Sequence, residues 1–329
     1  MALDAGDLQE VEAVLLAAGA GGLAWGRVRG GGLESTPAGE AFHQAYRHQA
    51  LAYLVRQARI AEVAQHLRRA GIEPFMGKGW AVASLYGEPG LRPCGDIDLY
   101  VGRQDHGAAA LALRGPAGDL VDLHCGFAEL DDRGEAELRA RSRTVPVGPG
   151  TVRIFGPEDH LRLIALHALR HGLLRPLWLC DVAVALESAG ERFDWDYFAG
   201  GGRRRAHWSF VALEVAREIL GARNERSMAG PPPARLPRWV IPAVLQEWGA
   251  ARPPHGARVP ASELLRRPGA WWGALRLRWP NPIEATIGLR TSFGGLPRLP
   301  LQVGECVRRT ALFSVQRAQA LVTPPGQRG

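Results

Sequence analysis

The sequence predicts an α+β protein, with a small mixed β-sheet and flanking helices followed by a helical domain. Three observations carry this prediction. Apolar residues recur at helical spacing between residues 40 and 70. Short segments of alternating polar and apolar residues follow between 72 and 155, which is typical of strands. From Pro157 onward the spacing is helical again, and the acidic pair Glu158 and Asp159 suits the first turn of a helix.

These patterns predict three parts of the chain. We expect an N-terminal helical segment at residues 1–44, a sheet domain at 45–156 and a helical C-terminal domain at 157–329. A chain of 329 residues is long enough to bury the cores that this arrangement needs.

Two helices and a glycine-rich connection are expected before the sheet. Residues 8–20 have the pattern of a short helix, and residues 40–70 that of a long helix ending at Gly71, a usual position for a helix-terminating glycine. Residues 19–32 between them are rich in glycine and follow no strand. We therefore expect a loop there, and no phosphate-binding turn.

Five strand segments and several helices are expected in the rest of the chain. Gly148-Pro149-Gly150 lies between two of the strand segments and predicts a hairpin. The strand segments are 72–76, 96–101, 120–124, 143–147 and 151–155. Helical patterns lie at 80–86, 104–114, 129–141, 158–172, 176–190, 206–221 and 302–322.

Composition and charge narrow the classes of function. No run of about 18 uncharged apolar residues occurs, so no transmembrane helix is expected. The N-terminus is acidic and lacks the basic start of a secretory signal, so the cytoplasm is the expected location. The four cysteines form no CxxC pair, which argues against structural zinc and a disulfide framework. The net charge of +7 is spread along the chain without a nucleic-acid motif, so nucleic acid is not the expected acceptor or partner.

One basic residue differs in kind from all the others. Lys78 is the single lysine in the chain, and every other permanently charged cation is arginine. Lys78 lies between Gly77 and Gly79 in a predicted turn from a strand to a helix. An ammonium is a compact point charge that often binds phosphate, whereas guanidinium is a wide planar fork. The position therefore favours a phosphate-binding role, with the chance survival of a surface lysine as the alternative.

Acidic residues on two predicted strands form the candidate active site. Asp96 and Asp98 are two residues apart on the first strand, so they share a face, while Ile97 and Leu99 face the core. Asp122 lies between two apolar residues on the next strand. If the two strands are neighbours, the three carboxylates meet.

A cluster of three carboxylates needs a compensating charge. Each pair repels by roughly 1 kcal/mol at 4 Å in water, and by about 4 kcal/mol at an effective dielectric constant near 20. Mg²⁺ or Mn²⁺, which prefer oxygen ligands, would supply that charge. We therefore predict Asp96, Asp98 and Asp122 as metal ligands, with Asp122 also the candidate base. A nucleoside triphosphate, with ATP as the first candidate, would be bound by the Gly77-Lys78-Gly79 turn and by Arg92.

At these residues the chain resembles the polymerase-beta-type nucleotidyltransferase superfamily, and within it a branch of bacterial nucleotidyltransferase-like proteins. The resemblance covers roughly residues 45–190. It implies a mixed-sheet catalytic domain at 45–156, and transfer of a nucleoside monophosphate to an acceptor in natural-product or polysaccharide biosynthesis. The usual Gly-Ser of the superfamily is replaced here by Gly-Lys-Gly-Trp. The matching segments are Met76 to Trp80, Leu91 to Leu99, Val121 to His124, and Pro157 to Leu161 leading to Leu166-His167-Ala168.

Two other classes of function fit the same residues. A glycosyltransferase with a DxD motif would use one metal ion and a nucleotide sugar, and would not need Asp122. A nucleotide-binding or antitoxin-like module would bind a partner without catalysis.

Several further residues have a weaker case. His160, His167 and His171 recur on one helical face and line either a domain interface or an acceptor pocket. His124 shares a strand face with Asp122 and is a candidate substrate contact. Asp181 lies in an apolar helical stretch, where we expect it to have a charged partner.

Overall fold

The computed structural model describes residues 4–223, 235–250 and 278–322. The chain divides into two compact units. The first comprises Met1–His167 and Arg175–Ala234, and the second comprises Ala168–Leu174 and Arg235–Gly329. The predicted metal ligands, the Gly77-Lys78-Gly79 turn and Arg92 all lie in the first unit.

The first unit is built on a mixed five-stranded sheet in the order β3-β2-β1-β5-β4. Strand β1 runs antiparallel to β2 and parallel to β5, β2 runs parallel to β3, and β4 and β5 form the predicted antiparallel hairpin. The predicted α+β fold with a mixed sheet and flanking helices is confirmed. The strands are β1 (Phe75–Met76), β2 (Ile97–Val101), β3 (Val121–Cys125), β4 (Arg143–Val147) and β5 (Gly150–Ile154).

Helices occupy most of the remaining described chain. The predicted long helix is α3, with Thr36 as its N-cap and Pro37 at its first position. In the first unit the helices are α1 (Ala5–Ala17), α2 (Gly21–Val28), α3 (Pro37–Arg69), α4 (Gly79–Ala83), η1 (Ser84–Tyr86), α5 (His106–Ala112), η2 (Gly115–Gly118), η3 (Ala128–Leu130), α6 (Glu135–Arg141), α7 (Pro157–Arg170, whose last residues fall in the second unit), α8 (Pro176–Glu187), α9 (Trp195–Ala199) and α10 (Arg203–Leu220).

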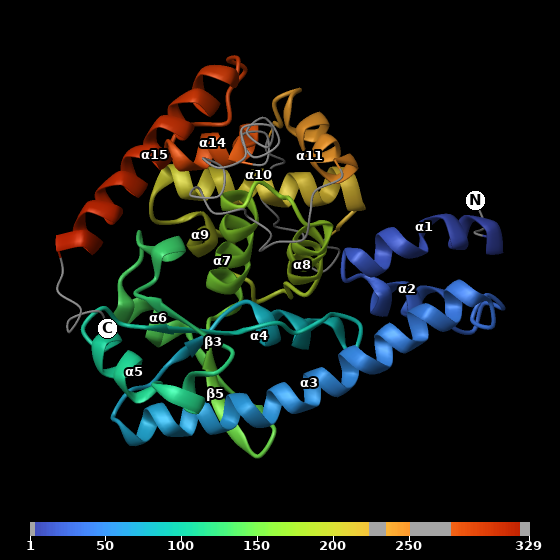
Figure 1. Ribbon diagram of the computed structural model, residues 1–329, viewed down its shortest axis with the longest axis horizontal. Helices are drawn as coiled ribbons and strands as arrows, with labels where there is room; N and C mark the ends of the chain where they lie inside the picture. The colour runs from blue at the N-terminus through green and yellow to red at the C-terminus, as the bar shows by residue number, and fades with distance from the viewer. Residues whose placement is uncertain (1–3, 224–234, 251–277, 323–329) are drawn as a thin grey trace. The chain divides into compact units, whose positions relative to one another are not determined.

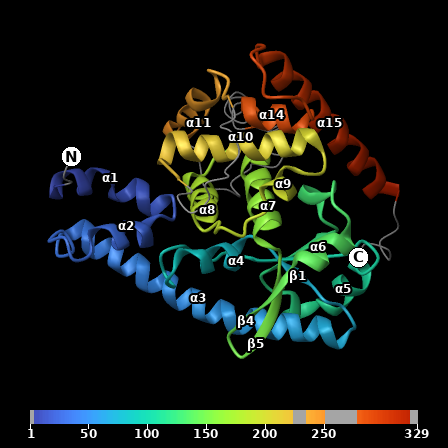
Figure 2. The ribbon, with the colours of Figure 1, turned by 180° about the vertical axis from the view of Figure 1, so that it is seen from behind.

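The two faces of the sheet bury separate sets of side chains. On one face, apolar residues of α3, α4 and α5 pack against Ile97, Leu99 and Val101 of β2. On the other face, a smaller cluster contains Tyr100 of β2 together with residues of η3, α6 and α7. Figures 1 and 2 both show α3 on one side of the sheet and α7 on the other. The alternation along β2 thus sends its odd-numbered residues to α3 and its even-numbered residues to the opposite face.

A network of buried charges holds α7 in the first unit. Arg162 of α7 is completely buried and donates to Asp132 and to the carbonyl groups of Phe198 and Gly200. Arg133 Nε lies 3.1 Å from a carboxylate oxygen of Asp159. Because a buried charge is costly without a partner, this network fixes the position at which α7 meets the sheet domain.

The expectation of a loop at residues 19–32 is wrong, because α2 occupies Gly21–Val28. Trp25 of this helix stacks on His43 of α3, with ring centroids 4.2 Å apart. A Cβ atom at Gly22 would lie 1.9 Å from the carbonyl oxygen of Gly90. The glycines therefore permit close packing of a short helix, and this requirement cannot be distinguished from loop composition in the sequence.

The second unit has its own helices and polar contacts. Asn281 caps α14 in a capping box with Glu284 and donates from Nδ2 to the carbonyl of Gly172 at 2.8 Å. The buried carboxylate of Glu305 accepts from Arg308 and Arg309 on its own helix. The helices of this unit are α11 (Val240–Gly249), α14 (Pro282–Gly288) and α15 (Leu299–Val322).

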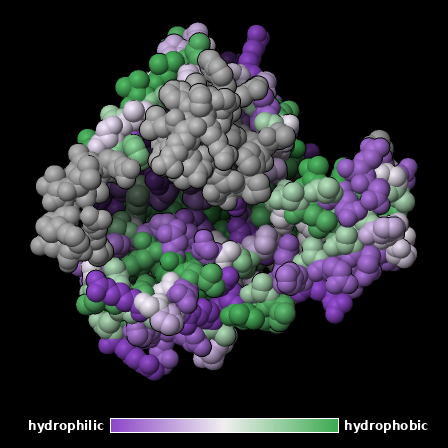
Figure 3. Space-filling view, viewed as in Figure 1, coloured by the Kyte–Doolittle hydropathy of each residue, from purple (hydrophilic) through white to green (hydrophobic). Residues whose placement is uncertain are grey.

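The outer face of α3 carries exposed apolar side chains. Leu51, Leu54 and Val55 are all more than half exposed, and Figure 3 shows an apolar surface over the middle of this helix. Within the described ranges, no helix combines the length and the apolar character that a membrane span requires.

The close approach at Gly22 gives a prediction about stability. We expect Gly22→Ala to destabilise the protein by about 1–3 kcal/mol, because the new methyl group must displace the backbone at Gly90. Gly107→Ala in α5 is the matched control, since a Cβ there meets nothing within 4 Å and alanine favours a helix. Urea unfolding of the two variants measures the difference, and equal stabilities would contradict the packing argument.

His160 gives a second prediction, on pH. Burial, with smaller effects from Arg143 and Arg92, lowers the pKa of His160 from 6.5 to about 4. The unfolded chain therefore takes up a proton at this site at a higher pH than the folded chain. The resulting stability is complete above the ordinary pKa and is lost as the pH falls toward the folded pKa.

We expect the wild type to lose about 2 kcal/mol of stability through His160 between about pH 7.5 and pH 5. His160→Leu should show a smaller loss over the same interval, because leucine does not titrate. Urea unfolding at both pH values checks this, and comparing each protein with itself cancels the cost of the substitution at neutral pH. An identical pH dependence in the two proteins would disprove it.

Candidate functional site

The pairing of β2 with β3 brings two of the predicted carboxylates together. The strands are parallel, and their register places Asp98 opposite Asp122 and Tyr100 opposite His124. Residues opposite each other in a sheet share a face, and alternate residues of one strand do as well. These four side chains therefore form one patch on the face turned away from α3.

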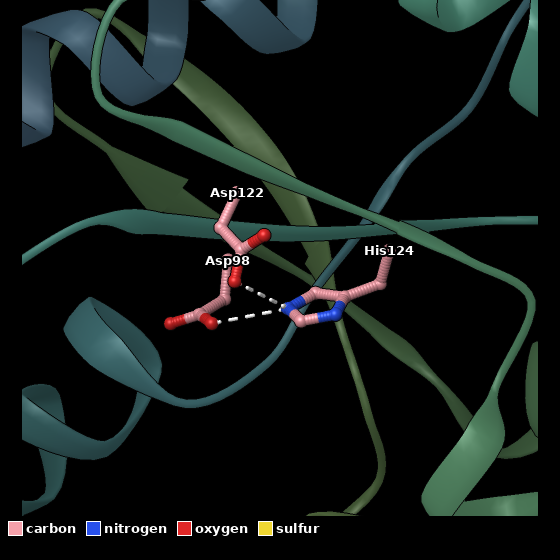
Figure 4. A group of neighbouring side chains, drawn as sticks. All are labelled: Asp98, Asp122 and His124. Atoms are coloured by element: carbon pink, nitrogen blue, oxygen red, sulfur yellow. Dashed lines mark hydrogen bonds and ion pairs between the residues drawn. The ribbon is translucent and has the colours of Figure 1, made fainter. Parts of the chain in front are cut away.

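Asp98, Asp122 and His124 form a compact group. The Nε2 atom of His124 lies 3.2 Å from Oδ1 of Asp98 and 3.3 Å from Oδ2 of Asp122 (Figure 4). Each residue offers one potential ligand atom, and these atoms all lie within 4.8 Å of one another. The His124 ring stacks on Tyr100, with centroids 4.3 Å apart, so its orientation is fixed by packing.

The turn Gly77-Lys78-Gly79, called the lysine turn below, follows β1 and lies against Asp98 and His124. Lys78 Nζ lies 2.8 Å from Oδ1 of Asp98 and 3.2 Å from Nε2 of His124. Lys78 is buried, and its backbone has φ 45° and ψ −149°, a conformation that only glycine adopts without strain. Such strain persists only where the surrounding structure holds the residue in place.

The two glycines beside Lys78 are required by close packing. A Cβ atom at Gly77 would lie 2.6 Å from Leu163 and 2.9 Å from the Tyr100 ring. A Cβ atom at Gly79 would lie 3.0 Å from the carbonyl oxygen of Asp96 and 3.2 Å from Oδ2 of Asp98, at a backbone φ of 36°. The turn therefore lies directly against the acidic strand.

The electrostatics of the two carboxylates differ. Burial opposes the ionisation of Asp98, but the hydrogen bond with His124 and the charge of Lys78 outweigh it, so the pKa of Asp98 is lowered. The Asp98 side chain is 15% exposed and that of Asp122 is 56% exposed. Asp98 is thus an ionised group inside the site, whereas Asp122 lies at its open side.

Asp96 lies at the edge of this arrangement. It is exposed and sits in a bend before β2, which begins at Ile97. The group with ligand spacing in the described part of the chain comprises Asp98, Asp122 and His124, without Asp96. A metal-binding role for Asp96 stays a prediction.

Arg92 connects the lysine turn to Asp181. It donates from Nε and Nη2 to the two carboxylate oxygens of Asp181, at 3.0 and 2.8 Å, and from Nη1 to the carbonyl of Gly79 at 3.2 Å. Tyr86 also donates to Asp181, at 2.8 Å. Burial, followed by the Asp181 charge, raises the pKa of Tyr86, so its hydroxyl remains a donor. The predicted phosphate contact of Arg92 stays a prediction, and these contacts assign it a positioning role.

The partner of Asp181 could not be identified in the sequence. A partner was expected, and Arg92 fills this role from 89 residues away. The ring of Tyr100 under His124 was also missed, although its separation of two residues from Asp98 placed it on the same strand face.

The three histidines of the predicted helical face have different surroundings. His160 is buried, and its Nε2 has no hydrogen-bond partner. The ring of His167 packs edge-on against Trp178 of α8, with centroids 5.2 Å apart. His171 belongs to the second unit. Their role in an interface or an acceptor pocket stays a prediction.

Comparison with known proteins places the chain in a family. No curated protein matches it. Among solved structures it is similar to an antigenic nucleotidyltransferase-like protein from Paracoccidioides brasiliensis, with 16% identity over 54% of this chain and 93% of that chain and a TM-score of 0.38. Residues 4–116 and 118–211 match a family described as uncharacterised nucleotidyltransferase. This match covers well over half of the chain and includes the lysine turn, both acidic strands and Asp181, so the chain belongs to that nucleotidyltransferase family.

Proposed function

We propose that the protein transfers a nucleoside monophosphate from a nucleoside triphosphate, ATP being the first candidate, to a small-molecule, peptide or protein acceptor. One observation carries the proposal. Asp98 and Asp122 are paired across two parallel strands, beside the strained turn that holds the single lysine. Membership of a nucleotidyltransferase family supports the same reaction class.

The residues fit a divalent cation. Two carboxylates and an imidazole nitrogen lie within 4.8 Å of one another, a spacing that one ion can bridge. Carboxylate oxygens suit Mg²⁺ and Mn²⁺, and imidazole is also an accepted ligand of many first-row metals. Asp98 and Asp122 would hold the ion, with Asp96 as a further ligand from the bend before β2. A bound cation would neutralise charge on the phosphates and acidify the acceptor group.

The proposed transfer exchanges one phosphorus–oxygen bond for another. An acceptor oxygen forms a bond to the α-phosphorus, and the bond from that phosphorus to the bridging oxygen of the β-phosphate breaks. Pyrophosphate leaves with the electron pair of the broken bond. The acceptor proton passes to the Asp122 carboxylate, whose exposed position allows an incoming acceptor to reach it.

Lys78 would bind the phosphates of the nucleotide. Helix α4 has five residues, so its dipole contributes little, and the ammonium is the stronger attraction for an anion. Arg92 acts indirectly by positioning the turn, because its hydrogen bond to the Gly79 carbonyl and its ion pair with Asp181 connect the turn to α8. We further propose a cytoplasmic setting and an acceptor from natural-product or polysaccharide biosynthesis.

Label transfer tests the reaction class. The protein is incubated with each α-labelled nucleoside triphosphate, Mg²⁺ or Mn²⁺, and fractionated lysate as the source of acceptors. We expect Asp98→Asn and Asp122→Asn to lose about 100-fold or more of the transfer, because each removes a charged ligand. Asp119→Asn is the matched control, since it removes an exposed carboxylate three residues before Asp122.

Two results would redirect the proposal. Full activity of Asp122→Asn with a nucleotide sugar would indicate a DxD glycosyltransferase. Absence of any Mg²⁺-dependent nucleotide binding by calorimetry would indicate a non-catalytic module.

The Arg92–Asp181 pair yields a prediction about support of the turn. Asp181→Leu leaves a buried guanidinium without its partner, so we expect a loss of roughly 3–5 kcal/mol of stability. The double variant Arg92→Met with Asp181→Leu should recover much of that loss, because neither charge remains. Urea unfolding measures both. A double variant no more stable than Asp181→Leu would contradict the assigned contacts.

Nucleotide affinity separates the two roles of Arg92. If Arg92 only positions the turn, Asp181→Leu and the double variant both raise the KM for the nucleotide. Arg92→Lys then has a KM between those of the double variant and the wild type. If Arg92 contacts phosphate itself, removal of Asp181 alone leaves the KM nearly unchanged in the protein that remains folded. Steady-state kinetics at saturating acceptor measures this.

A further inference from the structure

The Lys78 ammonium occupies the position of a counter-ion inside the candidate metal site. Its Nζ lies within hydrogen-bond distance of Asp98 Oδ1 and of His124 Nε2, at 2.8 and 3.2 Å. These atoms belong to two of the three residues that have the spacing of metal ligands. The acidic patch is therefore already partly neutralised by the chain itself.

A divalent cation bound to Asp98 would be repelled by the Lys78 ammonium. A metal ion lies about 2.1 Å from its oxygen ligand, so an ion on Oδ1 of Asp98 would lie within about 5 Å of the ammonium. The Lys78 and Asp98 side chains are 11% and 15% exposed. Water therefore screens the repulsion between the two cations only weakly.

Lys78 has a second possible partner in the proposed reaction. Triphosphate oxygens attract an ammonium as strongly as a carboxylate does, and the lysine side chain has four rotatable bonds. When Lys78 turns to the phosphates, Asp98 loses its counter-ion and can accept a metal ion.

We infer that Lys78 makes metal binding depend on nucleotide binding, by competing for Asp98 until phosphate draws it away. This inference rests on the proposed function for the nucleotide half of the exchange, whereas the competition with metal stands on the geometry alone. Linkage requires that the nucleotide strengthens metal binding by the same factor as the metal strengthens nucleotide binding. Between turnovers the protein then holds a divalent ion only weakly.

Metal binding to the nucleotide-free protein tests the competition. Mn²⁺ titration followed by electron paramagnetic resonance measures the dissociation constant without any turnover. We expect Lys78→Met to bind Mn²⁺ about tenfold more tightly than the wild type or better, because the competing charge is gone. Arg69→Met is the control for net charge, since Arg69 is exposed at the end of α3, which packs on the opposite face of the sheet. It should change Mn²⁺ affinity by no more than about twofold.

The single lysine also permits a measurement on the wild-type protein. Isotope-labelled lysine gives one side-chain signal in the chain, that of Lys78, by nuclear magnetic resonance. We expect this signal to shift when Mg²⁺ alone reaches saturation, and at a lower Mg²⁺ concentration when α,β-methylene-ATP is present. This measurement tests the competition between Lys78 and Mg²⁺ even if Lys78→Met does not fold.

The outcomes separate the inference from the proposed function. Lys78→Met with the Mn²⁺ affinity of the wild type, or a lysine signal unmoved by saturating Mg²⁺, would overturn the competition. Tighter Mn²⁺ binding in Lys78→Met, together with a wild-type protein that does not bind the nucleotide analogue, would retain the competition and overturn the coupling to nucleotide, along with the proposed function.

Discussion

The parallel pairing of β2 with β3 is the constraint on which the candidate site depends. It sets Asp98 opposite Asp122 and Tyr100 opposite His124. The apolar residues between them fix this register, because Ile97 and Leu99 are buried in the core under α3 and Val121 and Leu123 pack against the same core. A slip of one residue would exchange the faces and bury the Asp122 carboxylate in apolar packing. Hydrophobic burial on one face of the sheet thus determines which polar groups meet on the other.

Charge balance is the second requirement, and the chain meets it through a connected set of contacts. Lys78 lies against Asp98, and its strained backbone is held between two glycines that allow the turn to approach the strand. Arg92 binds the carbonyl of Gly79, and Asp181 of α8 holds Arg92 through both carboxylate oxygens. The position of the ammonium therefore depends on a helix that lies almost 90 residues away from Arg92 in the sequence. Family membership alone would not reveal this dependence, because it arises from three-dimensional contacts.

The local parts of this arrangement could be predicted, and the long-range parts could not. Period-two alternation identified β2 and β3, and it predicted that Asp98 and Asp122 face away from the core. Asp96 shows the limit of the rule, since β2 begins one residue later and Asp96 lies in a bend where alternation no longer applies. The partner of Asp181 depends on tertiary structure and leaves no local signal. Helix α2 was missed because glycine composition is the same for a loop and for a helix packed at very short distance.

The chain uses lysine only at position 78 and arginine elsewhere. The contact of Lys78 with Asp98, beside the stacked rings of His124 and Tyr100, explains this choice. A guanidinium can make two parallel hydrogen bonds to a carboxylate, a geometry that holds the carboxylate more firmly than one ammonium contact does. It would also need lateral space beside His124 and Tyr100, which are stacked on each other. An ammonium fits as a point charge and can exchange one anionic partner for another by rotating about single bonds. In the proposed reaction, a residue that neutralises Asp98 at one stage and phosphate at the next has to be released easily, and lysine satisfies this requirement where arginine does not.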